Sequence, residues 1–370
     1  MKEKSPRILL VRLSAVGDVI NTLPALAALR QRLPRAHLAW LVEDGAASIL
    51  EGHPLLDDLI VFERRRLGRA LKRISLWVRA PEPILKLRRQ LRRRRFDLLL
   101  DFHGNLRSGV LGSLAEAALR IGFGRRDSRE GNFLFSDFHV SLAERRIHRV
   151  EKHLALLRPL GIRPGAPSYC LHVPQAARDF AADYVRARLQ EPHRPLVVLH
   201  PGTSAFGAHK RWPAEHFARL AEGLVERVSA QVLVTHGPGE IELARQVAEQ
   251  SRHQVLMPET ASLQELAALI ERASAFVSAD TGPMHLAAAL KVPVVALFGP
   301  KDPVIYGPYG TASRVLLPPL DCSPCGSRRC PDAPCMRSIH PERVLDAVLD
   351  LLEDTRGVSC NPLHGQPEAP

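Results

Sequence analysis

The 370-residue sequence has no long apolar run. No stretch reaches the ~18 uninterrupted apolar residues of a membrane-spanning helix, so we expect no transmembrane helix. The apolar run Ile8–Val11 near the start is too short for the core of a signal peptide and predicts a first strand instead. We therefore expect a cytoplasmic protein, with peripheral attachment to a membrane left open.

Cysteine, aromatic and acidic residues are also few. Six cysteines do not suggest a disulfide framework, and a cytoplasmic location argues against one. Aromatic residues make up only 5% of the chain, so stacking platforms for nucleic-acid bases are scarce. The 51 Lys and Arg outnumber 39 acidic residues, which gives a formal net charge of +12. This excess indicates an anionic partner: nucleic acid, an acidic membrane surface or a phosphorylated substrate.

What the sequence does contain is short apolar runs that alternate with helical patterns. Hydrophobic residues make up 45% of the chain, enough to build the cores of two domains at this length. The alternation predicts an α/β fold with two Rossmann-like, doubly wound parallel sheets. The predicted strands are Arg7–Val11, His37–Val42, Leu59–Val61, Asp97–Asp101, Leu196–His200, Gln231–Thr235, Ala275–Ser278 and Val292–Leu297. The predicted helices include Asn21–Arg32, Gln175–Gln190, Ala214–Val228, Gly239–Ser251 and Leu263–Ala273.

The strand–helix rhythm is interrupted between about residues 160 and 195, where five prolines occur. We therefore predict an N-terminal domain over residues 1–174 and a C-terminal domain over residues 175–354. Residues 355–370 are polar and rich in Pro and Gly, which predicts a disordered tail. Ligands of such domains lie at the carboxyl ends of the strands, so we expect them in a cleft between the two halves.

The first candidate motif is RLSAVGDVINTLPAL, at Arg12–Leu26. A strand ends near Leu13, and a turn of small residues leads into a helix near Gly17 and Asp18. Gly17 allows a ligand to approach the backbone closely. The carboxylate of Asp18 is either a catalytic group at the end of the strand or a helix N-cap, a position that Asp favours.

The second motif, HPGTSAFGAHKRWP, follows the first predicted strand of the C-terminal half. Gly202, Thr203 and Ser204 offer backbone amides and hydroxyls to a phosphate, and Lys210 offers a point charge. The pattern favours an anion site over a surface loop with incidental basic residues.

The third motif is SADTGPMHLAAAL, in which Asp280, Thr281 and Gly282 lie between a strand and a helix. Such a turn presents amides and a helix N-terminus to an anion, and Asp280 can bind sugar hydroxyls. The alternative is that Asp280 or Thr281 is a structural N-cap. His285, one turn into the helix, is more typical of a packing histidine than of a catalyst.

In a fourth turn, GPGE, Glu240 follows the second predicted strand of this half. A carboxylate at this place suits a ribose diol. Alternatively it complements the dipole of the helix that follows.

A basic tract runs from Arg64 to Arg95 and holds fourteen Lys or Arg against one acidic residue, Glu82. The tract, which includes Arg65, suits an amphipathic surface helix on an anionic membrane or a phosphorylated glycolipid. Nucleic acid is the competing partner, but the low aromatic content disfavours it.

Four of the six cysteines are clustered with the spacing C-x2-C-x4-C-x4-C. Four thiolates suit tetrahedral zinc, but the second pair lacks the two-residue spacing of a zinc ribbon, so reduced thiols or a redox-sensitive pair are favoured. The cluster consists of Cys322, Cys325, Cys330 and Cys335.

Taken in order, these motifs resemble those of the bacterial lipopolysaccharide heptosyltransferases of glycosyltransferase family 9, which are inverting enzymes of the GT-B fold. The resemblance covers roughly residues 7–350 and includes DFHGNLRSG at Asp101–Gly109 and FGPKDP at Phe298–Pro303. The basic tract is longer and more basic than the family pattern. The cysteine segment also resembles a stretch found in many family members.

The resemblance implies ADP-heptose as donor, lipid A-linked Kdo or a first heptose as acceptor, no metal and no other cofactor. It also implies a cytoplasmic enzyme, peripheral at the inner face of the inner membrane, that binds no nucleic acid. Asp18 matches the general base. The implied acceptor contacts are Gly17, Arg64, Arg65 and Arg107. The implied donor contacts are Thr203, Ser204, Lys210, Glu240, Ala261, Asp280, Thr281, Gly282 and His285.

Two other functions are possible for a chain of this fold class, and the sequence disfavours both. A non-catalytic protein that binds anionic lipid or nucleic acid on the same fold would not need a base at Asp18 opposite Lys210 and Asp280. A nucleotide-sugar epimerase would show a GxxGxxG turn and a Tyr-x-x-x-Lys pair, and the sequence has neither.

Overall fold

The structure is a computed structural model that describes residues 5–66, 82–330 and 334–358, apart from positions 164, 166, 190 and 192. The chain forms two compact units, each with its own parallel sheet. Unit 1 holds Met1–Asp179 together with Thr260–Ala268 and Val304–Tyr309. Unit 2 holds Phe180–Glu259, Leu269–Pro303 and Gly310–Pro370.

The sheet of unit 1 has six strands in the order β3-β2-β1-β4-β5-β6, all parallel. This is the order in which successive connections reverse direction at the boundary between β1 and β4, which opens a crevice at the carboxyl ends of these two strands. The strands are β1 (Arg7–Val11), β2 (His37–Glu43), β3 (Asp58–Phe62), β4 (Phe96–Asp101), β5 (Ala117–Phe123) and β6 (Phe138–Val140).

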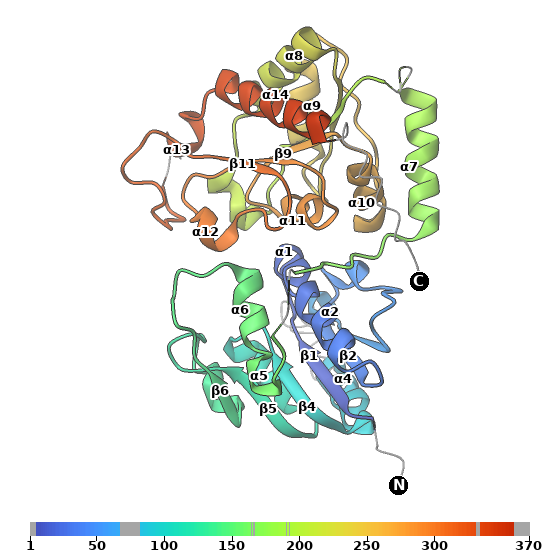
Figure 1. Ribbon diagram of the computed structural model, residues 1–370, viewed down its shortest axis with the longest axis vertical. Helices are drawn as coiled ribbons and strands as arrows, with labels where there is room; N and C mark the ends of the chain where they lie inside the picture. The colour runs from blue at the N-terminus through green and yellow to red at the C-terminus, as the bar shows by residue number, and fades with distance from the viewer. Residues whose placement is uncertain are drawn as a thin grey trace, which may run out of the picture. The chain divides into compact units, whose positions relative to one another are not determined.

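The helices of this unit cover both faces of the sheet (Figure 1). Side chains of α4 and α5 pack with those of β1 to β4 in one apolar cluster, and α2 packs against α6. The α-helices are α1 (Val16–Ile20), α2 (Leu23–Arg32), α4 (Glu82–Arg94), α5 (Leu106–Ser113), α6 (Arg149–Ala155) and α7 (Gln175–Arg188, which leads into unit 2). The 3-10 turns are η1 (Ala47–Ile49), η3 (Asn132–Phe135) and η4 (Arg158–Leu160).

The sheet of unit 2 has five parallel strands in the order β11-β10-β9-β7-β8, with the reversal between β7 and β9. Its strands are β7 (Leu196–His200), β8 (Gln231–Val234), β9 (Ala275–Ala279), β10 (Val294–Leu297) and β11 (Ser313–Leu316). Its helices are η5 (Ala205–Lys210), α8 (Ala214–Val228), α9 (Ile241–Gln250), α10 (Leu263–Glu271), α11 (Gly282–Ala289), α12 (Pro303–Tyr306), α13 (Pro334–Arg337) and α14 (Pro341–Val358); part of α10 and most of α12 group with unit 1.

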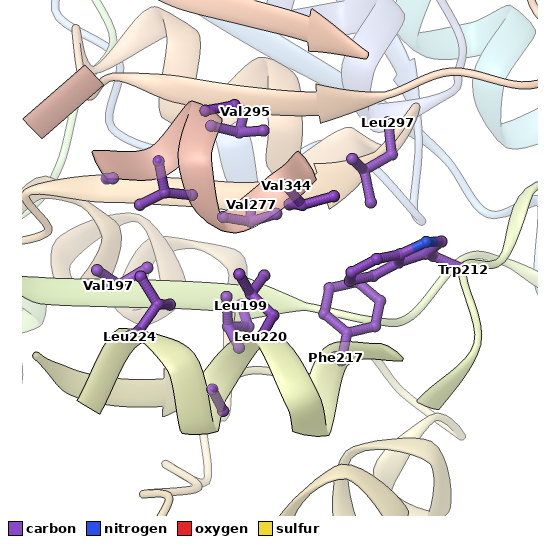
Figure 2. Packing of buried hydrophobic residues seen from close by; sticks show 14 of the residues in the cluster. Val197, Leu199, Trp212, Phe217, Leu220, Leu224, Val277, Val295, Leu297 and Val344 are labelled. Carbon is purple, nitrogen blue, oxygen red and sulfur yellow. The ribbon is translucent and has the colours of Figure 1, made fainter. Parts of the chain in front are cut away.

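Alternate residues of the strands in unit 2 build its core. Val197 and Leu199 of β7 and Val277 of β9 point to one face, where they meet Leu220 and Leu224 of α8 (Figure 2). Residues of α9 and α14 join the same cluster. The buried core fixes the strand register, and with it the positions of the loops that follow the carboxyl ends.

The predicted α/β class with two doubly wound sheets is confirmed, and all eight predicted strands are present. Three strands were not predicted, namely β5, β6 and β11. They lie at or next to sheet edges and mix polar with apolar residues, as in the exposed Leu119 beside Arg120 of β5, so they lack the continuous apolar run of a central strand.

Two further predictions concern the ends of elements. Helix α14 continues to Val358, so residues 355–358 are helical rather than part of a tail, and residues 359–370 lie outside the described residues. The amphipathic helix predicted in the basic tract rests on apolar residues between positions 67 and 78, and residues 67–81 lie outside the described residues. The described end of the tract forms α4 (Glu82–Arg94), with Leu87 and Leu91 buried. No helix in the described part of the chain is long and apolar enough to cross a membrane.

Candidate functional site

The strand-order reversal of unit 1 holds an ion pair between Arg12 and Asp18. Nη2 of Arg12 lies 2.6 Å from Oδ2 of Asp18, and the side chains are 7% and 32% exposed. Nη1 of Arg12 also donates to the carbonyl oxygen of Phe102, at 2.9 Å, just past the end of β4. The indole nitrogen of Trp40 donates to the carbonyl oxygen of Arg12, at 3.1 Å. Arg12 therefore connects the ends of β1 and β4 to the Asp18 carboxylate.

Asp18 is not the N-cap of its helix, so that alternative is wrong. The N-cap of α1 is Ala15, which makes no side-chain hydrogen bond, and Asp18 lies in the first turn. Gly17 is buried in the same turn, and its carbonyl oxygen accepts from the amide of Asn21 at 2.9 Å. Asp18 thus pairs with Arg12 and is not the N-cap residue of the helix.

The DFHGNLRSG loop after β4 is shaped by the buried carboxylate of Asp101. Its Oδ1 accepts from the amides of His103 and Gly104, at 2.9 and 3.1 Å. Its Oδ2 accepts from Ser108 Oγ at 2.8 Å and from Asn132 Nδ2 at 2.7 Å. Burial raises the pKa of Asp101, and these four hydrogen bonds oppose the rise. Asp101 is thus a structural residue that orients the loop carrying Arg107.

Glu43, at the end of β2, joins two of the predicted acceptor residues. Its carboxylate is only 4% exposed and lies 3.1 Å from Nε of Arg107 and 3.1 Å from Nη1 of Arg64. Arg107 also reaches Oγ of Ser14, in the turn before Asp18, at 3.3 Å. Arg65, the other predicted acceptor residue of this segment, donates through its amide to Asp44 Oδ2 at 3.2 Å.

Further basic side chains lie around this turn, and none of them was predicted from the sequence to have a role. The amine of Lys152 is largely buried, lies 4.3 Å from the ring centre of Phe123 and donates to the carbonyl oxygen of Asp127 at 2.6 Å. Burial, and then the charge of Arg149, lowers the pKa of Lys152 to about 8. Burial, and then the charge of Arg12, lowers the pKa of His103 to about 3. His103 is therefore neutral near pH 7.

The strand-order reversal of unit 2 holds a second ion pair. Nζ of Lys210 lies 2.7 Å from Oδ2 of Asp280 and donates to the carbonyl oxygen of Asp280 at 2.6 Å. Nε2 of His285 lies 3.9 Å from Oδ1 of Asp280. An ammonium has three donors, and the two contacts with Asp280 use two of them. The loop after β7 and the turn after β9 thus bring together three of the predicted donor residues.

The neighbouring predicted residues have structural contacts as well. Thr281 is the N-cap of α11, because its hydroxyl accepts from the amide of Met284 at 3.3 Å, and Gly282 begins the helix. The hydroxyl and carbonyl oxygens of Thr203 accept from Arg211 at 3.1 and 2.8 Å. Ser204 is exposed and is the N-cap of η5.

Glu240 closes the turn after β8. Its Oε2 accepts from the amide of Gly237 at 2.9 Å and lies 3.9 Å from Nε2 of the buried His200. His200 in turn shares a 3.0 Å hydrogen bond with the hydroxyl of Thr235 through Nδ1. A Cβ atom at Gly202 would overlap the Glu240 carboxylate, so any larger residue here would displace this carboxylate from its present position. His200 was not predicted as a site residue, although a histidine at the carboxyl end of an apolar strand is typical of a ligand-facing position.

Two predicted sites remain. Ala261 lies in the segment that groups with unit 1, and its amide donates to Glu265 Oε2 at 2.6 Å. The four clustered cysteines follow β11 in unit 2. Within the described ranges, no three His, Cys, Asp or Glu residues stand in a group that could hold a metal ion.

Comparison with known proteins identifies the family. A sequence profile described as glycosyltransferase family 9 (heptosyltransferase) matches residues 84–335. The chain belongs to this family. Lipopolysaccharide heptosyltransferase 1 of Pseudomonas aeruginosa is 30% identical over 367 residues, which cover 93% of this chain and 98% of that protein.

Solved structures agree in fold. A family 9 glycosyl transferase from Veillonella parvula superposes with a TM-score of 0.80 at 26% identity, covering 96% of this chain and 99% of the other. The E. coli heptosyltransferase WaaC with ADP-2-deoxy-2-fluoro heptose gives 0.72 at 26% identity, covering 93% and 99%. The chain is therefore a glycosyltransferase of the GT-B type, and a non-catalytic binding protein is not favoured.

His200 makes a pH-dependent contribution to stability. Burial, and then the charge of His236, lowers its pKa to about 4. Because the folded pKa lies below the unfolded value of about 6.5, the unfolded state binds the proton first, and stability is lost as pH falls from about 6.5 to about 4. From pH 7 to pH 5, the free energy of unfolding of the wild type should fall by about 2 kcal/mol more than that of His200→Gln, which lacks this titrating group.

Urea denaturation at the two pH values measures this difference. His193→Gln is the control, because His193 is exposed, and it should keep the wild-type slope. An identical pH dependence in His200→Gln and the wild type would contradict the assignment.

Proposed function

We propose that this glycosyltransferase transfers a heptose from ADP-heptose to the inner core of lipopolysaccharide. The observation that carries the proposal is the presence of one ion pair at each strand-order reversal, Arg12–Asp18 in unit 1 and Lys210–Asp280 in unit 2. The names of the relatives support it, since one is a lipopolysaccharide heptosyltransferase and another was solved with an ADP-heptose analogue. Each unit supplies one half of the machinery.

The donor binds to unit 2 in this proposal. The Lys210 ammonium, with its remaining N–H, and the amides at the start of α11 bind the diphosphate of ADP. Asp280 holds Lys210 in place and accepts hydrogen bonds from the sugar hydroxyls. Glu240 binds the ribose diol. Thr203 and Ser204 contact the phosphates, and Ala261 contacts the adenine. His285 stabilises the carboxylate of Asp280.

The acceptor binds to unit 1. Its inner-core sugars are anionic, and the Glu43-linked pair of Arg64 and Arg107 offers two guanidinium groups for carboxylate or phosphate oxygens. Gly17 and Arg65 belong to the same proposed acceptor surface. The exposed Arg88, Arg89, Arg92 and Arg93 of α4 would bind the acidic membrane surface, which makes the enzyme a cytoplasmic, peripheral one at the inner membrane.

The reaction is a single displacement with inversion. The acceptor hydroxyl oxygen attacks the anomeric carbon of the heptose, and the bond from this carbon to the diphosphate oxygen breaks. Asp18 takes the hydroxyl proton as general base, and ADP leaves with the bonding electrons. Lys210 and the α11 amides stabilise the charge that develops on the diphosphate, which is the part that a metal ion plays in other transferases.

A donor and acceptor panel with the purified protein tests the function. Transfer should occur from ADP-heptose and not from UDP- or GDP-sugars, and it should require a lipid A-linked inner-core acceptor. Added magnesium should not raise the rate, because Lys210 and backbone amides supply the charge stabilisation. Transfer from a UDP-sugar alone, or activity that requires added magnesium, would contradict the proposal.

Asp18→Asn tests the base. The amide cannot accept the proton, so kcat should fall by at least ~10²–10⁴-fold while ADP binding remains. Calorimetric titration with ADP and a transfer assay measure the two quantities. Asp183→Asn is the matched control, because Asp183 is 71% exposed and paired with an arginine three residues away. Near wild-type turnover by Asp18→Asn would exclude the base role.

Arg12 acts through Asp18 as a positioning residue. In Arg12→Gln, kcat should fall ~10-fold or more while KM for the donor stays constant. The acidic limb of the pH profile of kcat should also move to higher pH, because the nearby guanidinium favours the ionised form of the Asp18 carboxylate and its loss removes this effect. Arg12→Lys should restore part of both effects. A pH–rate series measures them, with Arg186→Gln of the exposed pair as control. An unchanged limb would refute the positioning role.

A further inference from the structure

The cysteine cluster lies in an unusual segment. Residues 317–330, between β11 and α13, contain no helix or strand. Ser323 Oγ donates to the carbonyl oxygen of Gly299 at 2.7 Å, and the amide of Gly326 donates to the carbonyl oxygen of Pro300 at 2.7 Å. A loop of this length without regular structure is uncommon in a compact domain unless it has a function or an added fastening.

All four cysteines of this segment line a single pocket. Its wall also includes His209, Gly299 and Pro300, and its volume is about 30 Å³. A cavity of this volume has room for only about two or three water molecules, so it suits a small ion better than an organic ligand. A Cβ atom at Gly299 would lie 2.7 Å from Sγ of Cys335, so glycine is what lets this buried thiol approach. The other cysteines of the pocket are Cys322, Cys325 and Cys330.

A second observation concerns His209, which lines the same pocket. Nε2 of His209 is buried and has no hydrogen-bond partner among the described atoms. A buried polar nitrogen without a partner carries a desolvation cost, so a partner for this nitrogen is expected. A metal-bound thiolate sulfur in the pocket would be such an acceptor.

We propose that Cys322, Cys325, Cys330 and Cys335 bind one divalent metal ion that takes tetrahedral thiolate ligands, as zinc does. Each thiol gives its proton to solvent as the ion binds. The thiols surround the pocket without yet forming a coordination group, so the ion itself draws the side chains together. Such coupling of metal binding to local ordering is usual for loops that lack a core.

The ion has a structural role and takes no part in the transfer. Four protein ligands close a tetrahedral site and leave no position for substrate. His209 donates to a thiolate and immediately precedes Lys210, so the ion would stiffen the loop that holds this lysine against Asp280. This last link rests on the proposed function, whereas the metal site itself does not.

Metal analysis of the full-length protein tests the site. Protein purified under reducing conditions without added chelator should contain one zinc or iron per chain by plasma mass spectrometry. Cys325→Ser should lose the metal, whereas Cys170→Ser should keep it, because Cys170 is an exposed cysteine outside the cluster. His209→Ala should retain the metal but raise KM for the donor.

Cobalt binding gives a readout that does not depend on the folding of a variant. Cobalt added to wild-type protein stripped of metal should produce an intense thiolate-to-cobalt charge-transfer band, which one equivalent of zinc removes. Wild-type protein without bound metal and without this band would overturn the proposal. So would a Cys322–Cys325 disulfide in the freshly purified protein, or full metal content in Cys325→Ser. The metal analysis and the cobalt titration use no sugar donor, so a failure of the donor panel leaves these two tests intact.

Discussion

The reversal of strand order in each sheet is the constraint on which the rest of the molecule depends. Where two neighbouring parallel strands send their connections to opposite faces, no connection covers their carboxyl ends, and a crevice remains. In unit 1 this point lies between β1 and β4, so the Asp18 turn meets the loop of Arg107. In unit 2 it lies between β7 and β9, which brings Lys210 to Asp280. Residues far apart in the chain become neighbours because of topology alone.

Both crevices hold a largely buried ion pair, and such pairs are weak sources of stability because desolvation of the charges offsets their attraction. Their value here is geometric. Arg12 is fixed by the carbonyl oxygen of Phe102 before it meets Asp18, and Lys210 is fixed by two oxygens of the same aspartate. Removal of one partner would leave a buried charge uncompensated, which is far more costly than the pair is favourable. The arrangement therefore limits each carboxylate to one orientation.

The sequence predicted the centre of each sheet and the turns that follow it, because buried parallel strands are continuous apolar runs bounded by small residues. It did not predict β5, β6 and β11, which lie at or next to sheet edges and interrupt their apolar residues with polar ones such as Arg120, His139 and Arg314. Local sequence also could not exclude a cap role for Asp18, since that role depends on which residue is the N-cap of α1, and this residue is Ala15. Glu43 and His200 were missed because their partners are contributed by distant strands and loops.

The distribution of positive charge also distinguishes two uses of arginine. On α4 the side chains of Arg88, Arg89 and Arg93 are exposed, so they offer attraction without a fixed geometry. Arg107, by contrast, is held from one side by the buried Glu43 carboxylate and from another by Ser14. A guanidinium that is oriented before the ligand arrives loses less conformational entropy on binding than a mobile one. The net charge of +12 therefore predicts only the class of an anionic partner, whereas in the proposed function the anchored Arg107 would select one particular anionic group of the acceptor.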